Sequence, residues 1–379
     1  MAAPPVRHPA DVVWEVRLLA VVTAVLVVFG LATTYGASSL EPTRTGTIGA
    51  AFFLRQGVGA LAGGVLLLAC ARLDYQRWRP LAWPLLGLTV VLLVALLLPL
   101  PRTIVVAEHG ARRWLRLGPV QLQPSELAKL TFVIWCAMLA AKKGDQVRDF
   151  KRGTLPFLLM MGIVAGLVLK QPNLSMATVI ALLGGLVLFG AGAKIGHFVV
   201  LAVCGLLGVY QLIRGREYRL KRLLAFLDPD SNPDTALQLK QSLIGIGSGG
   251  LQGVGFGEGQ LKLGHLPFAY SDFLFSTIGE EWGFLGVCLV VGLYAVFCWL
   301  GFRIARTAPD PFGQFLALGL TAAVGITAFL HMAVTLGLMP TTGLTLPFMS
   351  YGRSSLVISL AGTGILMSVG RARGRPARG

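Results

Sequence analysis

Long apolar runs recur along almost the whole chain, and they constrain the fold more than any other feature. A helix needs about 20 apolar residues to cross a bilayer core, because no water is present there to satisfy its backbone groups. The runs lie at residues 16–38, 50–71, 80–100, 125–141, 155–170, 175–191, 195–213, 278–302, 314–337 and 354–370. They predict an all-α, polytopic integral membrane protein with about ten transmembrane helices.

Composition supports this class and excludes an ordinary soluble enzyme. Of the 379 residues, 55% are hydrophobic and 13% are charged, whereas soluble domains carry about 25% charged residues. The net charge of +16 would indicate a nucleic-acid partner in a soluble protein. In so apolar a chain it indicates anionic membrane lipids instead, and no nucleic acid.

Lysines and arginines in the short connections predict the orientation, since such residues accumulate on the cytoplasmic side. Fifteen of them follow the second, fourth, sixth and eighth predicted spans or lie in the tail. Both termini are therefore predicted to be cytoplasmic. The predicted organisation is a cytoplasmic N-terminal arm at 1–15, one transmembrane domain at 16–370 and a basic cytoplasmic tail at 371–379.

A large extracytoplasmic loop is predicted at 214–277, between the seventh and eighth spans. Leucines at helical spacing over 220–227, with arginines on another face, predict a basic amphipathic helix at the membrane surface. A second short helix is expected at 234–246. The glycine-dense stretch at 245–259 is not expected to hold a helix, and it could let the backbone approach a ligand closely.

Several cations lie on the predicted outer side, against the general charge pattern. Arg102, Arg112, Arg113 and Arg116 precede the fourth span, and five more open the large loop at 214–222. They could anchor the protein at lipid phosphates. Alternatively, they could form a pocket for a phosphate-bearing substrate, because guanidinium groups bind phosphate bidentately.

Ionisable groups in or beside the spans are further candidates. Glu126 and Lys129 are three residues apart on one helix face, so a structural ion pair and a functional role are both open. Asp272 precedes an apolar helix and could be its N-cap or a functional acid. Glu280 would lie about 12 Å from Asp272 on a continuing helix, too far for the two carboxyls to share a proton.

Taken together, the motifs resemble the SEDS family of membrane peptidoglycan polymerases. The resemblance rests on Gly-Ala-Arg-Arg-Trp-Leu-Arg-Leu-Gly at 110–118, Gln-Pro-Ser-Glu-Leu-Ala-Lys at 123–129 and Gln-Ser-Leu-Ile-Gly-Ile-Gly-Ser-Gly-Gly at 241–250. It also rests on Ser-Asp-Phe-Leu-Phe at 271–275 and Leu-Pro-Phe-Met-Ser-Tyr-Gly at 346–352. Several long motifs in the same order make the resemblance specific, and two stretches resemble the division branch more than the elongation branch.

The resemblance implies ten transmembrane helices in the bacterial cytoplasmic (inner) membrane and an extracytoplasmic active site. It implies an inverting glycosyltransferase that polymerises lipid II into a growing glycan strand, with undecaprenyl pyrophosphate as the leaving group. A class B penicillin-binding protein, a transpeptidase, is the implied partner. Asp272 matches the catalytic carboxylate of the family, while Glu126, Lys129 and Arg113 match other important positions.

This chemistry fits the residues. Asp272 can act as general base toward the attacking sugar hydroxyl, a role generally worth about 10²- to 10⁴-fold in rate. Pyrophosphate leaves readily, so the site needs positive charge, for which Arg113 with Arg112 and Arg116 are candidates. No cofactor is certain. A divalent cation such as Mg²⁺ or Mn²⁺ could share the charge neutralisation, and its ligands are unknown.

The sequence departs from the family pattern at Asn173, Tyr270 and Arg353. Asn173 lacks a carboxylate, which puts in question any charge network linking that position to Lys129. Two other functions stay open: a flippase that transports lipid-linked precursors, and a noncatalytic scaffold for the penicillin-binding protein. The motifs do not decide whether the protein acts in cell division or in cell elongation.

Overall fold

The computed structural model describes residues 11–38, 50–101, 103–108, 111–118, 120–215, 217–228 and 233–372. Most of the predicted N-terminal arm and of the predicted basic tail lies outside these residues. Helix α1 begins at Asp11, inside the predicted arm.

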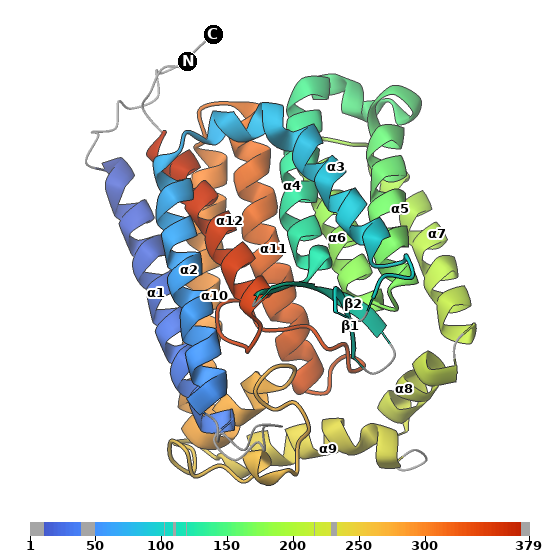
Figure 1. Ribbon diagram of the computed structural model, residues 1–379. Coiled ribbons are helices and arrows are strands. Elements are labelled where there is room, and N and C mark those ends of the chain that lie inside the picture. Colours follow the sequence, from blue (N-terminus) through green and yellow to red (C-terminus); the bar gives the residue numbers. More distant parts are fainter. Residues whose placement is uncertain are drawn as a thin grey trace.

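Upright helices dominate the structure (Figure 1). They are α1 (Asp11–Ser38), α2 (Ala50–Arg72), α3 (Trp78–Ala95), α4 (Pro124–Lys143), α5 (Leu155–Lys170), α6 (Leu174–Gly190), α7 (Ile195–Arg214), α10 (Leu274–Arg306), α11 (Pro311–Thr335) and α12 (Arg353–Arg371). Eight of them are long and apolar enough to cross a membrane, and α6 and α7 supply two shorter apolar stretches. Their positions confirm the predicted polytopic, helical membrane fold.

The helix α4 lies at the centre of the bundle, packed by α3, α6 and α11. Nearly all of its side chains from Pro124 to Ala140 are buried, whereas α2 and α3 expose many large apolar side chains. In a membrane protein, exposed apolar side chains face lipid, so this pattern distinguishes the inner helix from the peripheral ones.

The large loop carries the two predicted helices, α8 (Glu217–Leu227) and α9 (Pro233–Ser248), which lie across one end of the bundle (Figure 1). The expectation that no helix forms beyond residue 245 is wrong for the first four residues, since α9 continues to Ser248. The reason is close packing: a Cβ on Gly245 would lie 2.3 Å from the Leu261 side chain, so glycine there serves contact rather than flexibility.

A small antiparallel sheet precedes α4, and the sequence did not predict it. Its strands are β1 (Val105–Glu108), β2 (Ala111–Leu117) and β3 (Val120–Leu122), in that order. Val105 and Leu115 pack with Leu96 in a separate small core. The predicted third span is correspondingly too long at its end, because α3 stops at Ala95 ahead of two prolines, Pro99 and Pro101.

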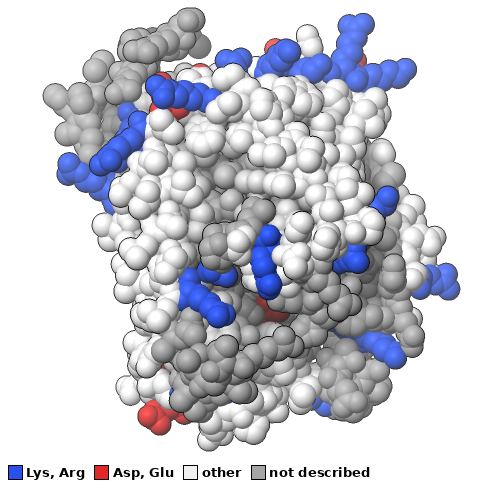
Figure 2. Space-filling view, viewed as in Figure 1, with Lys and Arg blue, Asp and Glu red and all other residues white. Residues whose placement is uncertain are grey.

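Local helices complete the connections. They are η1 (Tyr75–Arg77), η2 (Gly144–Arg148), η3 (Phe150–Thr154) and η4 (Leu261–Leu263). The first three lie at the end of the bundle away from α8 and α9, and η4 lies in the large loop. Figure 2 shows many Lys and Arg side chains along that first end, the upper edge of the view, and another group on the lower half of the molecule. Of the cations predicted on the outer side, Arg102 and Arg216 lie outside the described residues.

Candidate functional site

Asp272 lies between a short turn and the beginning of α10. Its backbone N–H donates to the carbonyl of Phe268 at 3.0 Å, and the helix begins two residues later at Leu274. The N-cap residue is Phe273, with no side-chain cap bond. Asp272 is therefore not the N-cap of this helix, so helix capping does not account for its carboxylate.

Two arginines and a serine act on the half-buried Asp272 carboxyl. Burial raises its pKa above the ordinary aspartate value. A hydrogen bond from the Ser271 side chain and the charges of Arg222 and Arg113 act in the opposite direction and favour the ionised form. The structure thus brings Asp272 and one predicted arginine, Arg113, into one electrostatic environment.

Arg113 reaches this position through an irregularity in the sheet. Val106 pairs with Trp114 and Ala107 with Arg112, so Arg113 is an extra residue without a partner on β1. This is the geometry of a β-bulge, which redirects a side chain. The Arg113 guanidinium donates to the carbonyls of Gln171, at 3.3 Å, and Pro172.

Arg222 comes from α8, on the other side of the site. Its guanidinium donates to the carbonyl of Thr341 at 3.1 Å. The sequence placed this arginine among the cations of an amphipathic helix and of a possible phosphate pocket, but did not select it as a site residue. The available signal was its position on the predicted outer side of the membrane, which eight other cations shared.

The segment 341–343, between α11 and α12, connects these elements. Thr341 accepts the bond from Arg222, and Thr342 accepts a hydrogen bond from the Ser175 hydroxyl at 2.7 Å. Gly343 faces the acid itself, since a Cβ there would lie 3.3 Å from Oδ2 of Asp272. One short loop therefore contacts α6, α8 and the Asp272 carboxyl.

Arg112 and Arg116 are not among the charges that act on Asp272. Arg112 is exposed and donates to the carbonyl of Leu98 at 3.2 Å. Arg116 is also exposed, and it pairs through its backbone with Gln121 of β3. The predicted cluster of three arginines is thus divided, and only Arg113 among them contributes to the electrostatic environment of the acid.

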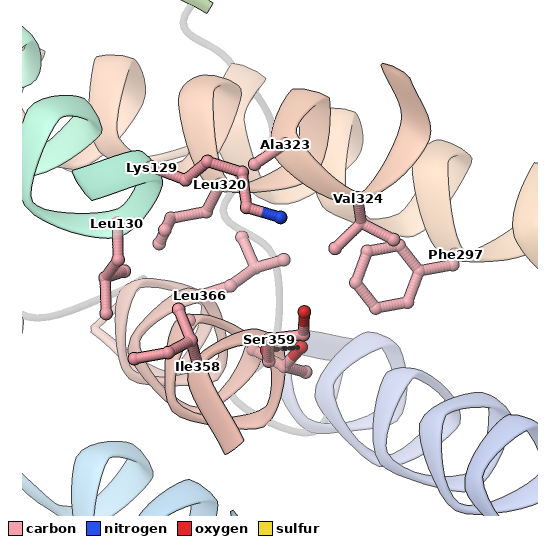
Figure 3. Close-up of a pocket in the computed structure, with 11 residues that line it drawn as sticks. Lys129, Leu130, Phe297, Leu320, Ala323, Val324, Ile358, Ser359 and Leu366 are labelled. Carbon is pink, nitrogen blue, oxygen red and sulfur yellow. Dashed lines mark hydrogen bonds between the residues drawn. The ribbon is translucent and has the colours of Figure 1, made fainter. Parts of the chain in front are cut away.

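Glu126 and Lys129 form an ion pair at 2.9 Å in the first turns of α4, with both side chains buried. The Lys129 ammonium points into a small cavity bounded by α4, α10, α11 and α12 (Figure 3). The cavity, of about 30 Å³, has room for a water molecule or two. Most of its walls are apolar, so the pair is held in a poorly solvated environment inside the bundle.

Removing one member of this pair is expected to be costly. Lys129→Met leaves the Glu126 carboxylate buried without its partner, which should lower the free energy of unfolding by about 3 kcal/mol or more. The double variant Glu126→Gln/Lys129→Met should regain much of that loss, because no buried charge is left uncompensated. Unfolding of the purified variants in detergent measures both, and equal losses in the single and double variants would contradict this account.

The three departures from the family pattern have defined surroundings. Asn173 is the N-cap of α6, and its Oδ1 accepts from the N–H of Met176 at 3.1 Å. Tyr270 packs against Phe52 and Tyr351, with ring centroids 5.0 and 5.7 Å away. Arg353 begins α12, and its side chain packs beside Gly59 of α2. Asn173 therefore keeps a capping role without a carboxylate.

Within the described residues, no group of three His, Cys, Asp or Glu side chains is placed to hold a metal ion. Glu280 serves the loop instead, since its carboxylate accepts from the N–H groups of Gln260 and Leu261 at 2.8 and 3.2 Å. The charge opposite Asp272 comes from arginines, and a contribution from Mg²⁺ or Mn²⁺ stays a prediction.

The helical bundle and its polar site define a polytopic membrane protein with a charged site at one end of the helices. Comparison with known proteins is specific: the cell cycle protein family of FtsW, RodA and SpoVE matches residues 16–374. The chain belongs to this family.

Similar proteins include a probable peptidoglycan glycosyltransferase FtsW of Trichlorobacter lovleyi, 42% identical, with 94% of this chain and 93% of that protein covered. Stage V sporulation protein E of Bacillus subtilis is 35% identical, with 93% and 96% covered. The resemblance found in the sequence, including its FtsW-like character, is thereby confirmed.

Solved structures agree. A chain from a structure described as the structural coordination of polymerization and crosslinking by a peptidoglycan synthase complex has a TM-score of 0.79 and 30% identity, with 94% of this chain and 98% of that chain covered. The crystal structure of the rod shape determining protein RodA of Thermus thermophilus has a TM-score of 0.68 and 30% identity, with 94% and 97% covered.

Proposed function

We propose that this protein is a peptidoglycan glycosyltransferase that polymerises lipid II at the outer face of the cytoplasmic membrane, with Asp272 as its general base. The glycosyltransferase names of its relatives and the family membership support the reaction class. The observation that carries the residue assignment is the Asp272 carboxyl, which no helix end uses and which lies in the field of two arginines.

In the proposed step, a sugar hydroxyl of one substrate attacks the anomeric carbon of a second, lipid-linked sugar. The new C–O bond forms as the bond to the pyrophosphate oxygen breaks, and the hydroxyl proton passes to Asp272. The leaving pyrophosphate carries away the electron pair and needs positive charge, not a proton, for stabilisation. One carboxylate with nearby cations meets both requirements.

Arg113 and Arg222 are the proposed pyrophosphate ligands. Each guanidinium is directed by carbonyl groups on a different loop, Arg113 by the turn at 171–172 and Arg222 by Thr341. Such fixed donors need little reorganisation when charge develops on the leaving group. Arg112 and Arg116 are exposed and are assigned no direct role in this step, and the buried pair of Glu126 and Lys129 supports the fold.

The acidic limb of the pH–rate profile tests these arginines. Since the charge of Arg222 favours the ionised Asp272, Arg222→Gln should raise the pKa of that carboxyl further. A base must be ionised to act, so the acidic limb of kcat/KM should move to higher pH, as it should for Arg113→Gln. Arg116→Gln is the matched comparison and should leave the limb in place. An unmoved limb in both site variants would refute the arrangement.

Polymerisation of purified lipid II tests the function itself. Wild type and Asp272→Asn are compared alone and with the cognate class B penicillin-binding protein, the proposed partner, whose transpeptidase activity is blocked. Glycan that is made by the wild type but not by Asp272→Asn supports the proposal. Transport of labelled lipid II across proteoliposomes without glycan would favour a flippase, and full cellular function of Asp272→Asn would favour a scaffold.

A further inference from the structure

The last turns of α10 carry an aromatic and basic surface that the proposed reaction does not use. Trp299, Phe302, Arg303 and Arg306 recur at i, i+3, i+4 and i+7, which places them on one helix face. With Thr307 they line an open pocket of about 410 Å³. This end of α10 is the opposite one from Asp272, so the pocket is separate from the candidate active site.

The wall of this pocket is held by contacts with α1. Arg303 forms an ion pair with the buried Glu15 carboxylate. The same guanidinium lies over the rings of Trp14 and Trp299, at 5.1 and 5.5 Å from their centroids. These cation–π contacts and the ion pair fix two indoles and a guanidinium in one arrangement, so the surface is ordered before any ligand arrives.

Arg306 lies about one turn beyond Arg303, and its side chain is exposed. Glu15 neutralises Arg303, whereas Arg306 makes no hydrogen bond or ion pair with the residues described here. The pocket therefore combines a neutralised, rigid wall with a second guanidinium whose charge is uncompensated within the described chain. An anion bound beside Arg306 would balance this charge.

The position of the pocket relative to the bilayer indicates which anion binds there. The α10 backbone is interrupted at Gly283, where φ is +61°, and from there to Arg306 the helix extends about 35 Å. A bilayer core is about 30 Å thick, so the arginines lie at headgroup level. Tryptophans are typical of this interface, and the upper edge of Figure 2 carries many other cations of the same end.

We propose that this pocket binds the headgroup phosphate of an anionic phospholipid such as phosphatidylglycerol. Arg306 takes the phosphate, while Trp299 and Phe302 contact the glycerol and the first acyl carbons. The pocket lies on one face of α10, at the end predicted to be cytoplasmic, where the anionic surface of the membrane attracts basic side chains. The proposal is independent of the glycosyltransferase reaction, because it involves none of the residues near Asp272.

Native mass spectrometry of the purified full-length protein tests this site. Phosphatidylglycerol and phosphatidylcholine with the same acyl chains are added in competition to wild type, Arg306→Gln and Arg148→Gln. Arg148 is the matched control, because it is an exposed arginine on the same end of the bundle, in η2. Thermal unfolding in detergent verifies that each variant is folded.

The expected result is a preference of the wild type for phosphatidylglycerol that falls about fivefold in Arg306→Gln, the effect of one basic residue at a membrane surface, and is unchanged in Arg148→Gln. An unchanged preference in Arg306→Gln, or an equal fall in both variants, would overturn the site. A further arm adds inorganic phosphate in large excess. Displacement of the lipid by phosphate would show a site for free phosphate and overturn the lipid assignment.

Discussion

Asp272→Asn is expected to lower the rate of lipid II polymerisation by about 10²- to 10⁴-fold, the range for loss of a general base. The amide keeps the size of the carboxyl but cannot accept the hydroxyl proton. Stability should change little, because the Asp272 side chain caps no helix and Phe273 occupies the N-cap position. Quantified glycan product from the purified protein with its partner measures the rate.

Asp149→Asn is the matched control for this prediction. The Asp149 carboxylate accepts from the N–H of Arg152 at 2.7 Å, at the other end of the bundle, so the same chemical change there should leave polymerisation intact. Substantial activity in a folded Asp272→Asn protein would remove Asp272 from the role of base.

Gly343→Ala is expected to reduce polymerisation by about 10²-fold, the scale of a small misplacement of a catalytic group. The added methyl group would lie 3.3 Å from Oδ2 of Asp272, so the carboxylate must shift away from its position. The residue also has a φ of +70°, a conformation that costs alanine roughly 1–2 kcal/mol. The rate and the unfolding free energy are measured on the same preparation.

Gly337→Ala separates these two effects. Gly337 lies in the same loop and has the same φ of +70°, but its Cβ would meet side-chain carbons of Leu243 at 3.4 Å. It should lose similar stability and keep its activity. If both alanine variants lost activity equally, backbone strain rather than contact with Asp272 would be the cause.

The transmembrane helices could be predicted because a membrane leaves the backbone few options. A run of about 20 apolar residues in lipid must be helical, and the ends of α5 agree with the prediction. The surface helices α8 and α9 were also predicted, since an amphipathic pattern depends only on local spacing. The end of α9 was not, because Gly245 makes a close contact with Leu261, which lies outside that helix.

The site was predictable only in part, for a related reason. Asp272 and Arg113 could be selected from short motifs, but the contribution of Arg222 depends on how α8 is folded back toward Thr341, 119 residues away along the chain. The sheet before α4 was missed as well, since the register of β2 is set by its pairing with β1. Local patterns carry no information on such distant pairings.

Because of the bulge at Arg113, the site depends on the number of residues in β2 as well as on their identity. Removing one residue from 111–117 would restore regular pairing with β1. A side chain other than the Arg113 guanidinium would then face the carbonyls of Gln171 and Pro172. Exchanges of residue type elsewhere in the strand leave this count intact, so the hairpin should tolerate substitution far better than insertion or deletion.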